Sequence, residues 1–239
     1  MIKDLSIFFK KETLVMGGLG FSAGLPIMLV FSTLSVWLVK AGVERSTVTL
    51  FSWAGFAYSF KFLWSPIVDK FRLPILNQYG HRRSWLFFSQ ILIIISILLA
   101  SLSDPQKNLS FMAISIVLIA FSSATQDIII DAFRIESAPE KKQGPLASMY
   151  LAGYRVAMIV SGAGSLWLAS HFSGSVYQLE VWKNVYQIIS LFMLIGLIST
   201  FFAKEPLMLK KNNIKNFEQI KFTVSTGVMR ICRCWLSRQ

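Results

Sequence analysis

The chain has 239 residues, of which 54% are hydrophobic, and its mean hydropathy is positive at +0.56. A formal net charge of +12 would suit a nucleic-acid-binding protein, but the long unbroken apolar runs exclude an ordinary soluble domain, and the sequence carries no base-reading or phosphate-binding motif. We therefore predict an all-α, polytopic membrane protein of six transmembrane helices, with membrane lipid and not nucleic acid as a partner.

Six apolar runs are long enough, at about 1.5 Å per helical residue, to cross a hydrocarbon core of about 30 Å. Lysines precede the first run as in a secretory signal, but that run is too long and no clear cleavage site follows, so we expect a retained helix. Residues 1–13 then form an N-terminal segment and 14–203 a transmembrane domain. In chain order the runs are Leu14–Val39, Thr47–Val68, Ser84–Ser103, Leu109–Ile130, Pro145–Ser170 and Asn184–Ala203.

The basic residues predict the orientation of these helices. Most of the 24 Lys and Arg residues lie before the first run, in the second and fourth links, and after the last run. Basic residues collect in loops that stay in the cytoplasm. Both the N-terminus and the C-terminus are therefore predicted to be cytoplasmic, and attraction to anionic lipid is a modest addition.

The first run contains the small-residue spacing Gly20-Phe-Ser-Ala-Gly24, followed by Pro26. Such spacing permits close contact between helices. The pattern therefore favours tight packing of this helix, and the alternative is a helix that lines a cavity and bends.

Ionisable residues within a membrane span are functional candidates by default. Arg155 lies ten residues beyond Pro145, or roughly 15 Å into the bilayer. Asp127 and Asp131 are four residues apart, so they share a helix face on which either carboxylate can meet Arg155 or Lys61 of another helix. The candidates for a substrate or proton path are Arg155, Asp127, Asp131, Gln126 and Lys61; the alternative is an ion-pair network that only joins helices.

An intramembrane enzyme is the second reading of the paired carboxylates, with Asp127 and Asp131 holding magnesium and a diphosphate. Prenyl-transfer enzymes of this kind need a second acidic cluster. Glu136 and Glu140 lie in an ordinary charged loop, so we expect no enzymatic activity and no catalytic residue. Cys232 and Cys234 form only a C-x-C in the tail, which indicates neither a metal site nor a cofactor.

The loop after the second run resembles a signature of the major facilitator superfamily. It reads Ser65-Pro-Ile-Val-Asp69-Lys70-Phe71 and closes with Gly80-His81-Arg82-Arg83. The family pattern is an acidic residue, a basic residue, and then a glycine before a basic pair; here it is stretched by residues 72–79. The resemblance implies gating roles for Asp69, Lys70, Gly80, Arg82 and Arg83, and the alternative is that these charges only mark topology.

Three further stretches resemble the muropeptide permeases, the AmpG-type branch of that superfamily. They are Lys61-Phe-Leu-Trp-Ser-Pro66, Ser123-Ala-Thr-Gln126-Asp127-Ile-Ile-Ile-Asp131-Ala-Phe-Arg134 and Gly153-Tyr154-Arg155, and the likeness runs from about residue 10 to Pro206. The resemblance implies the N-terminal six-helix half of the major facilitator fold in a bacterial inner membrane. It also implies a proton-driven symporter that imports anhydromuropeptides for peptidoglycan recycling.

Members of this family have two six-helix halves, and only one half is recognisable here. Residues 204–221 resemble a central cytoplasmic linker, whereas 222–239 are atypical and are interpreted as the product of a frameshift that truncates a permease. A homodimer or a complementary C-terminal half on another chain is then the expected partner. The competing hypothesis is a non-transporting membrane remnant or partner subunit.

Overall fold

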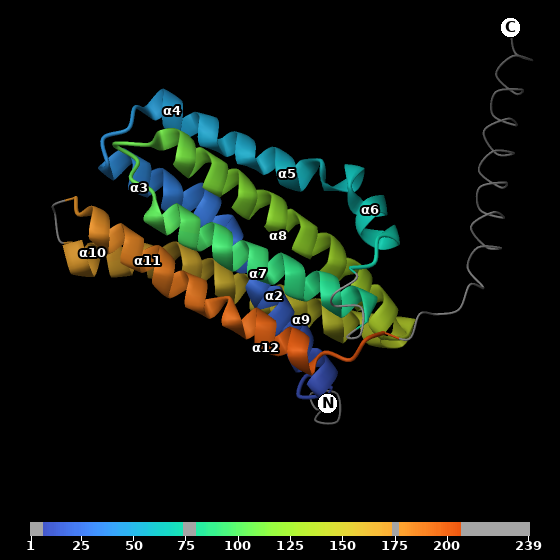
Figure 1. Cartoon of the computed structure of the whole chain (residues 1–239). Helices are drawn as coiled ribbons and strands as arrows, with labels where there is room; N and C mark the ends of the chain where they lie inside the picture. The colour runs from blue at the N-terminus through green and yellow to red at the C-terminus, as the bar shows by residue number, and fades with distance from the viewer. Residues whose placement is uncertain (1–6, 74–79, 174–176, 207–239) are drawn as a thin grey trace, which may run out of the picture. The chain divides into compact units, whose positions relative to one another are not determined.

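The computed structural model describes residues 7–73, 80–173 and 177–206 (Figure 1). The chain divides into two units, 1–206 and 207–239. The second unit lies outside the described residues, and with it most of the expected linker 204–221, the whole tail 222–239 and both cysteines. Every regular element within the described ranges is helical, in agreement with the apolar runs.

Five helices are long and apolar enough to cross a membrane, and they match five of the six predicted runs. Two of these spans contain a π-helical turn. One runs through α2 (Lys11–Met28), the π turn η1 (Leu29–Thr33) and α3 (Leu34–Lys40), and the other through α9 (Glu140–Ile159), the π turn η5 (Val160–Gly164) and α10 (Ser165–Ser173). The remaining three spans are α7 (His81–Leu102), α8 (Leu109–Ser137), and α11 (Leu179–Phe192) with α12 (Leu194–Phe202).

The second predicted span, Thr47–Val68, is not one continuous helix. It consists of α4 (Arg45–Leu50), the 3₁₀ turn η2 (Phe51–Gly55), α5 (Phe56–Ser59), the 3₁₀ turn η3 (Lys61–Leu63) and α6 (Ser65–Lys70). These pieces run beside α8 along one face of the bundle (Figure 1). Only Ala54 and Val68 are buried among them, so few packing contacts enforce regular α-helical geometry.

Local sequence sets several helix starts. Asn108 caps α8, because its Oδ1 accepts a hydrogen bond of 3.0 Å from the backbone N–H of Phe111. The helix α9 starts at Glu140, earlier than the predicted Pro145, which therefore lies inside the helix. Gln143 donates to the carbonyl of Ala138 at 2.7 Å and so ties the end of α8 to the start of α9.

The closest helix pair is α2 with α9, as the glycine spacing predicts. A side chain at Gly20 would overlap the carbonyl of Tyr150, and one at Gly24 would overlap the carbonyl of Tyr154. From the other helix, a side chain at Gly153 would overlap the carbonyl of Gly17. The absence of Cβ atoms on both helices therefore permits backbone-to-backbone contact.

Candidate functional site

An intramembrane ion pair joins the second span to α8. Lys61 Nζ lies 3.9 Å from Asp127 Oδ2, and the exposed fractions of the two side chains are 35% and 15%. The neutral phenols of Tyr58, Tyr150 and Tyr154 lie near Asp127. Because α8, α9 and the second span supply these groups, the cluster depends on tertiary packing.

The ion pair leaves part of the acid unused. Asp127 Oδ1 is buried and accepts no hydrogen bond from any described residue. Buried acceptors are normally paired, so an orphan carboxylate oxygen is a site for a proton or for a donor group of a ligand.

Asp131, which was predicted to share this chemistry, has a different partner. Its Oδ1 lies 3.2 Å from Nη2 of Arg134, one turn further along α8. The guanidinium of Arg134 in turn lies over the ring of Tyr150, 5.7 Å from its centroid. Asp131 is therefore paired locally, with neither Lys61 nor Arg155, because a partner on the same helix needs no long-range positioning.

Arg155 lies near the middle of the span 142–173, next to Tyr154. Its side chain is exposed and forms no ion pair or hydrogen bond within the described part of the chain. A charge at this depth is costly when it faces hydrocarbon. Arg155 thus remains available to a ligand or to another protein surface.

Gln126 points away from its neighbour Asp127 and into the helix bundle. Its side chain is fully buried, and Nε2 donates a 2.6 Å hydrogen bond to Oγ of Ser22 on α2. A second buried amide, Gln90, accepts a 3.0 Å hydrogen bond from Thr200. Consecutive helix residues are about 100° apart around the axis, so adjacency in sequence does not place Gln126 on the acidic face.

Four of the five predicted gating residues, all except Lys70, meet at a second polar cluster, where α6 and α8 end and α7 begins. Arg82 Nη1 donates to Oδ1 of Asp69 at 2.7 Å. Its Nη2 and Nε donate to the two oxygens of Glu136 at 2.6 and 3.0 Å. The result is a bidentate guanidinium–carboxylate pair with a second acid attached, the geometry in which arginine binds most strongly. Lys70 is exposed and forms no ion pair with the described residues.

Glu205, after the last span, completes this cluster. Its two carboxylate oxygens accept hydrogen bonds from the backbone N–H groups of Arg82 at 2.9 Å and Arg83 at 3.1 Å, at the start of α7. Gly80 leaves space for the Glu205 carboxylate, because a side chain at this position would overlap it. The φ of Gly80 is +101°, a conformation that other residues rarely adopt. Arg83 Nη2 donates to the carbonyl of Phe201 at 3.0 Å, so the end of α12 is held to the start of α7.

Glu136 and Glu205 were not among the predicted site residues. Glu136 was expected to lie in an ordinary charged loop, and no role was predicted for Glu205. Each is an acidic residue at the end of a span, and the basic pair Arg82–Arg83 needs acidic partners, which is the sequence signal that could have identified them.

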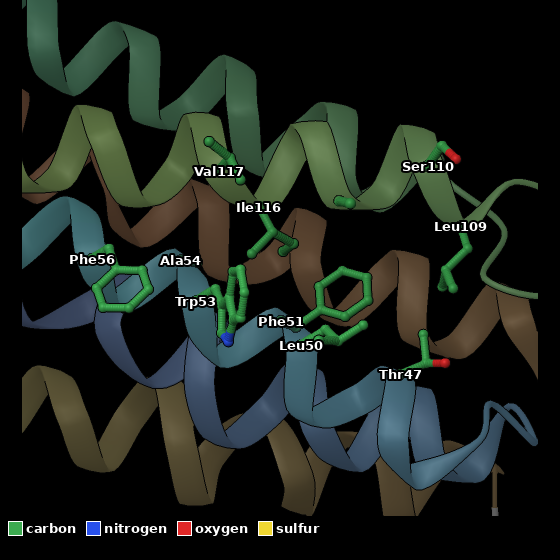
Figure 2. A pocket seen from close by; sticks show the side chains of 11 residues that line it. Thr47, Leu50, Phe51, Trp53, Ala54, Phe56, Leu109, Ser110, Ile116 and Val117 are labelled. Atoms are coloured by element: carbon green, nitrogen blue, oxygen red, sulfur yellow. The ribbon is translucent and has the colours of Figure 1, made fainter.

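An apolar pocket of about 380 Å³ lies between the second span and α8, at the end of these helices that is farther from the Arg82 cluster (Figure 2). Aromatic and aliphatic side chains line it, among them Phe51, Trp53 and Ile116, and Thr47 and Ser110 supply the hydroxyl groups. Because it contains no charged residue, this pocket is a poor site for a polar substrate, and the charged cluster at Asp127 remains the candidate. Within the described ranges, no three His, Cys, Asp or Glu side chains are grouped so that they could hold a metal ion.

The helical bundle, its buried ion pair and its polar end cluster are typical of a polytopic transporter. The sequence profile of the Major Facilitator Superfamily matches residues 18–235, and the chain belongs to this superfamily. That match extends into 222–239, the stretch set apart as atypical.

Three of the chain's relatives are named as a permease or as putative transporters. It is 37% identical to the anhydromuropeptide permease of Escherichia coli K12 over 202 residues, which cover 84% of this chain and 39% of that protein. It is 37% identical to the putative transporter AmpG 4 of Rickettsia felis (67% and 39% covered) and 34% identical to the putative transporter AmpG 3 of Rickettsia typhi (83% and 46% covered). The chain thus spans less than half the length of these relatives. All three are named as a permease or a putative transporter, so the comparisons lend no support to the enzyme alternative.

Proposed function

We propose that this chain forms one half of a secondary transporter that carries anhydromuropeptides across the bacterial inner membrane, driven by the proton gradient. The observation that carries the proposal is the Lys61–Asp127 pair, an acid and a base within the membrane with one carboxylate oxygen unpaired. The names of the related permeases supply the substrate class.

The chemistry of the cluster suits such a substrate. Tyrosine rings pack against sugars, and a phenol hydrogen-bonds to their hydroxyl groups. Lys61 and the unpaired Arg155 are the cations available for peptide carboxylates, and Asp127 is the acid available to take up a proton. Proton binding at Asp127 would release Lys61, which links the proton to the substrate.

The proposed orientation places both termini in the cytoplasm. The cluster of Asp69, Arg82, Glu136 and Glu205 then lies on the cytoplasmic side. In this position it holds the ends of α6, α7, α8 and α12 together. Its opening would let these helix ends separate, and it would therefore serve as a cytoplasmic gate.

A second half is part of the proposal, because Arg155 needs a polar surface that the described residues do not provide. Either a second copy of this chain or a separate C-terminal half would cover it. Secondary transporters bind their substrates between two such repeats.

The test is uptake of a radiolabelled anhydromuropeptide by proteoliposomes that contain this chain, with an inward proton gradient. We expect uptake above that of empty vesicles, loss of at least about tenfold in Asp127→Asn, and no change in Asp104→Asn, an acid outside the cluster. If the folded chain gives no uptake alone or with a supplied C-terminal half, the transport proposal fails and a non-transporting partner subunit replaces it.

A further inference from the structure

A second large groove lies on the face formed by α7, α10, α11 and α12. Its volume is about 770 Å³. None of its lining residues comes from α8, α9 or the second span, so it is separate from the Asp127 cluster. Its apolar lining includes Ile94, Leu98, Ile188, Leu191 and Leu194.

Two carboxamides interrupt this apolar surface. Asn184 and Gln187, three residues apart and therefore on one face of α11, both line the groove and are exposed. Neither side-chain carboxamide forms a hydrogen bond with any described residue. An unpaired amide in hydrocarbon is costly, so a partner with polar atoms is required at this level.

The depth of the two amides in the membrane indicates which hydrogen-bond acceptors they can reach. They lie five and eight residues from the start of α11, or roughly 8 and 12 Å along its axis. The polar layer of a bilayer is roughly 5–8 Å thick on each side of the core. With the start of α11 at the outer surface of the polar layer, the amides lie from the inner edge of that layer into the top of the hydrocarbon, where the glycerol esters of a phospholipid offer carbonyl acceptors.

We propose that this groove is a binding site for a diacyl phospholipid of the adjacent leaflet. Asn184 and Gln187 donate to its ester carbonyls, and one acyl chain lies along Leu191 and Leu194 toward the bilayer centre. The groove extends over about 20 Å of α11 and α12, from Val181 to Leu194, which exceeds the roughly 15 Å thickness of a hydrocarbon leaflet.

A second copy of the chain is the competing occupant. Such a copy would have to place polar side chains opposite both amides and fill the apolar groove at the same time, because the backbone carbonyls of its helices are already bonded. The ester carbonyls of a lipid are free.

Photolabelling tests the site. The chain is placed in vesicles of phosphatidylethanolamine and phosphatidylglycerol with a trace of phosphatidylethanolamine that carries a diazirine on one acyl chain. After irradiation, labelled peptides are located by mass spectrometry. We expect label concentrated on residues 94–98 and 188–194.

The double variant Asn184→Leu/Gln187→Leu should reduce labelling of these peptides at least fivefold, since about fivefold is the ratio that one net hydrogen bond gives and the variant removes two. Leu98→Trp, which keeps both amides but fills the groove, should reduce it as well. Ser170→Leu, on the exposed face of α10 outside the groove, is the matched control and should change nothing.

Labelling spread over all helices in proportion to exposure, or groove labelling unchanged in both variants, overturns the proposal. Dimers joined through α11 in a separate protein–protein cross-linking experiment would assign the groove to a second copy of the chain and also overturn the proposal. None of these readouts depends on transport.

Discussion

At the scale of single residues, the two charged clusters differ in how completely their hydrogen-bonding groups are satisfied. Arg82 donates to Asp69 and Glu136 and is held at its backbone by Glu205. The Lys61–Asp127 pair is longer, at 3.9 Å, and leaves Oδ1 unpaired. The satisfied cluster stabilises one arrangement of helix ends, whereas the unsatisfied one has capacity for a proton or ligand.

Arg82→Lys should destabilise the protein by about 1–2 kcal/mol, because a lysine ammonium cannot make the bidentate contact with Glu136. The expected loss of stability is small because Asp69 and Glu136 are 47% and 30% exposed, so solvent weakens both ion pairs. Thermal unfolding in detergent measures the change. Arg72→Lys, the same substitution at an exposed loop position, is the control, and equal effects at both positions would contradict the role assigned to Arg82.

At the scale of elements, α2 and α9 share two unusual features. Their backbones are in direct contact through glycines, and each contains a π-helical turn. The turns are bonded to each other, since Thr33 Oγ1 donates to the carbonyl of Ser161 at 2.8 Å. Insertions of this type leave carbonyls without helical partners and are frequent at functional positions. Tyr186 also donates to a carbonyl of the first π turn, that of Leu29, at 3.1 Å.

Gly20→Ala should destabilise the bundle by about 1–3 kcal/mol, because the new methyl group overlaps the backbone of Tyr150, which has no freedom to rotate away. Gly144→Ala should cost much less, about 0–1 kcal/mol, because the only close neighbour of a methyl group there is the ring of Pro145, the next residue along the helix. Paired melting curves of the two variants measure the difference, and equal losses of stability would refute this account.

Thr33→Val keeps the shape of the side chain but removes the hydrogen bond between the two π turns. We expect a cost of about 1–2 kcal/mol and faster amide hydrogen exchange confined to residues 29–33 and 160–164. Thr49→Val, which removes an exposed bond to the carbonyl of Arg45 in the same element, serves as the comparison. Unchanged exchange in both π turns would show that this bond does not hold them.

At the scale of the whole molecule, the exposed surface of the described helices combines Arg155 with large apolar side chains. In the second span these include Trp53, Phe56 and Phe62. Apolar exposure suits lipid, but an exposed arginine near mid-membrane does not. This mixture is what a surface between two halves of a transporter requires.

Arg155→Leu should therefore act in opposite directions on stability and function. In the isolated chain it removes a charge from the bilayer and should stabilise the folded state by about 2–3 kcal/mol. In the transport assay it should abolish uptake, because a substrate carboxylate loses its cation. Arg45→Leu, a charge removed at a span end, should do neither. A loss of stability in the isolated chain would mean that Arg155 already has a partner.

The sequence by itself determined the helical class, the positions of five spans and the superfamily, because hydrophobic length and short charged motifs are local properties of the chain. It also located Lys61, Asp127 and the Asp69–Arg82 loop. The tertiary structure decided the pairings: Asp131 with Arg134, Gln126 with Ser22, and Glu136 and Glu205 with the start of α7. It also decided that the second span is broken into short helices. Those outcomes depend on which helix faces meet, and no local pattern encodes the rotation of one helix against another.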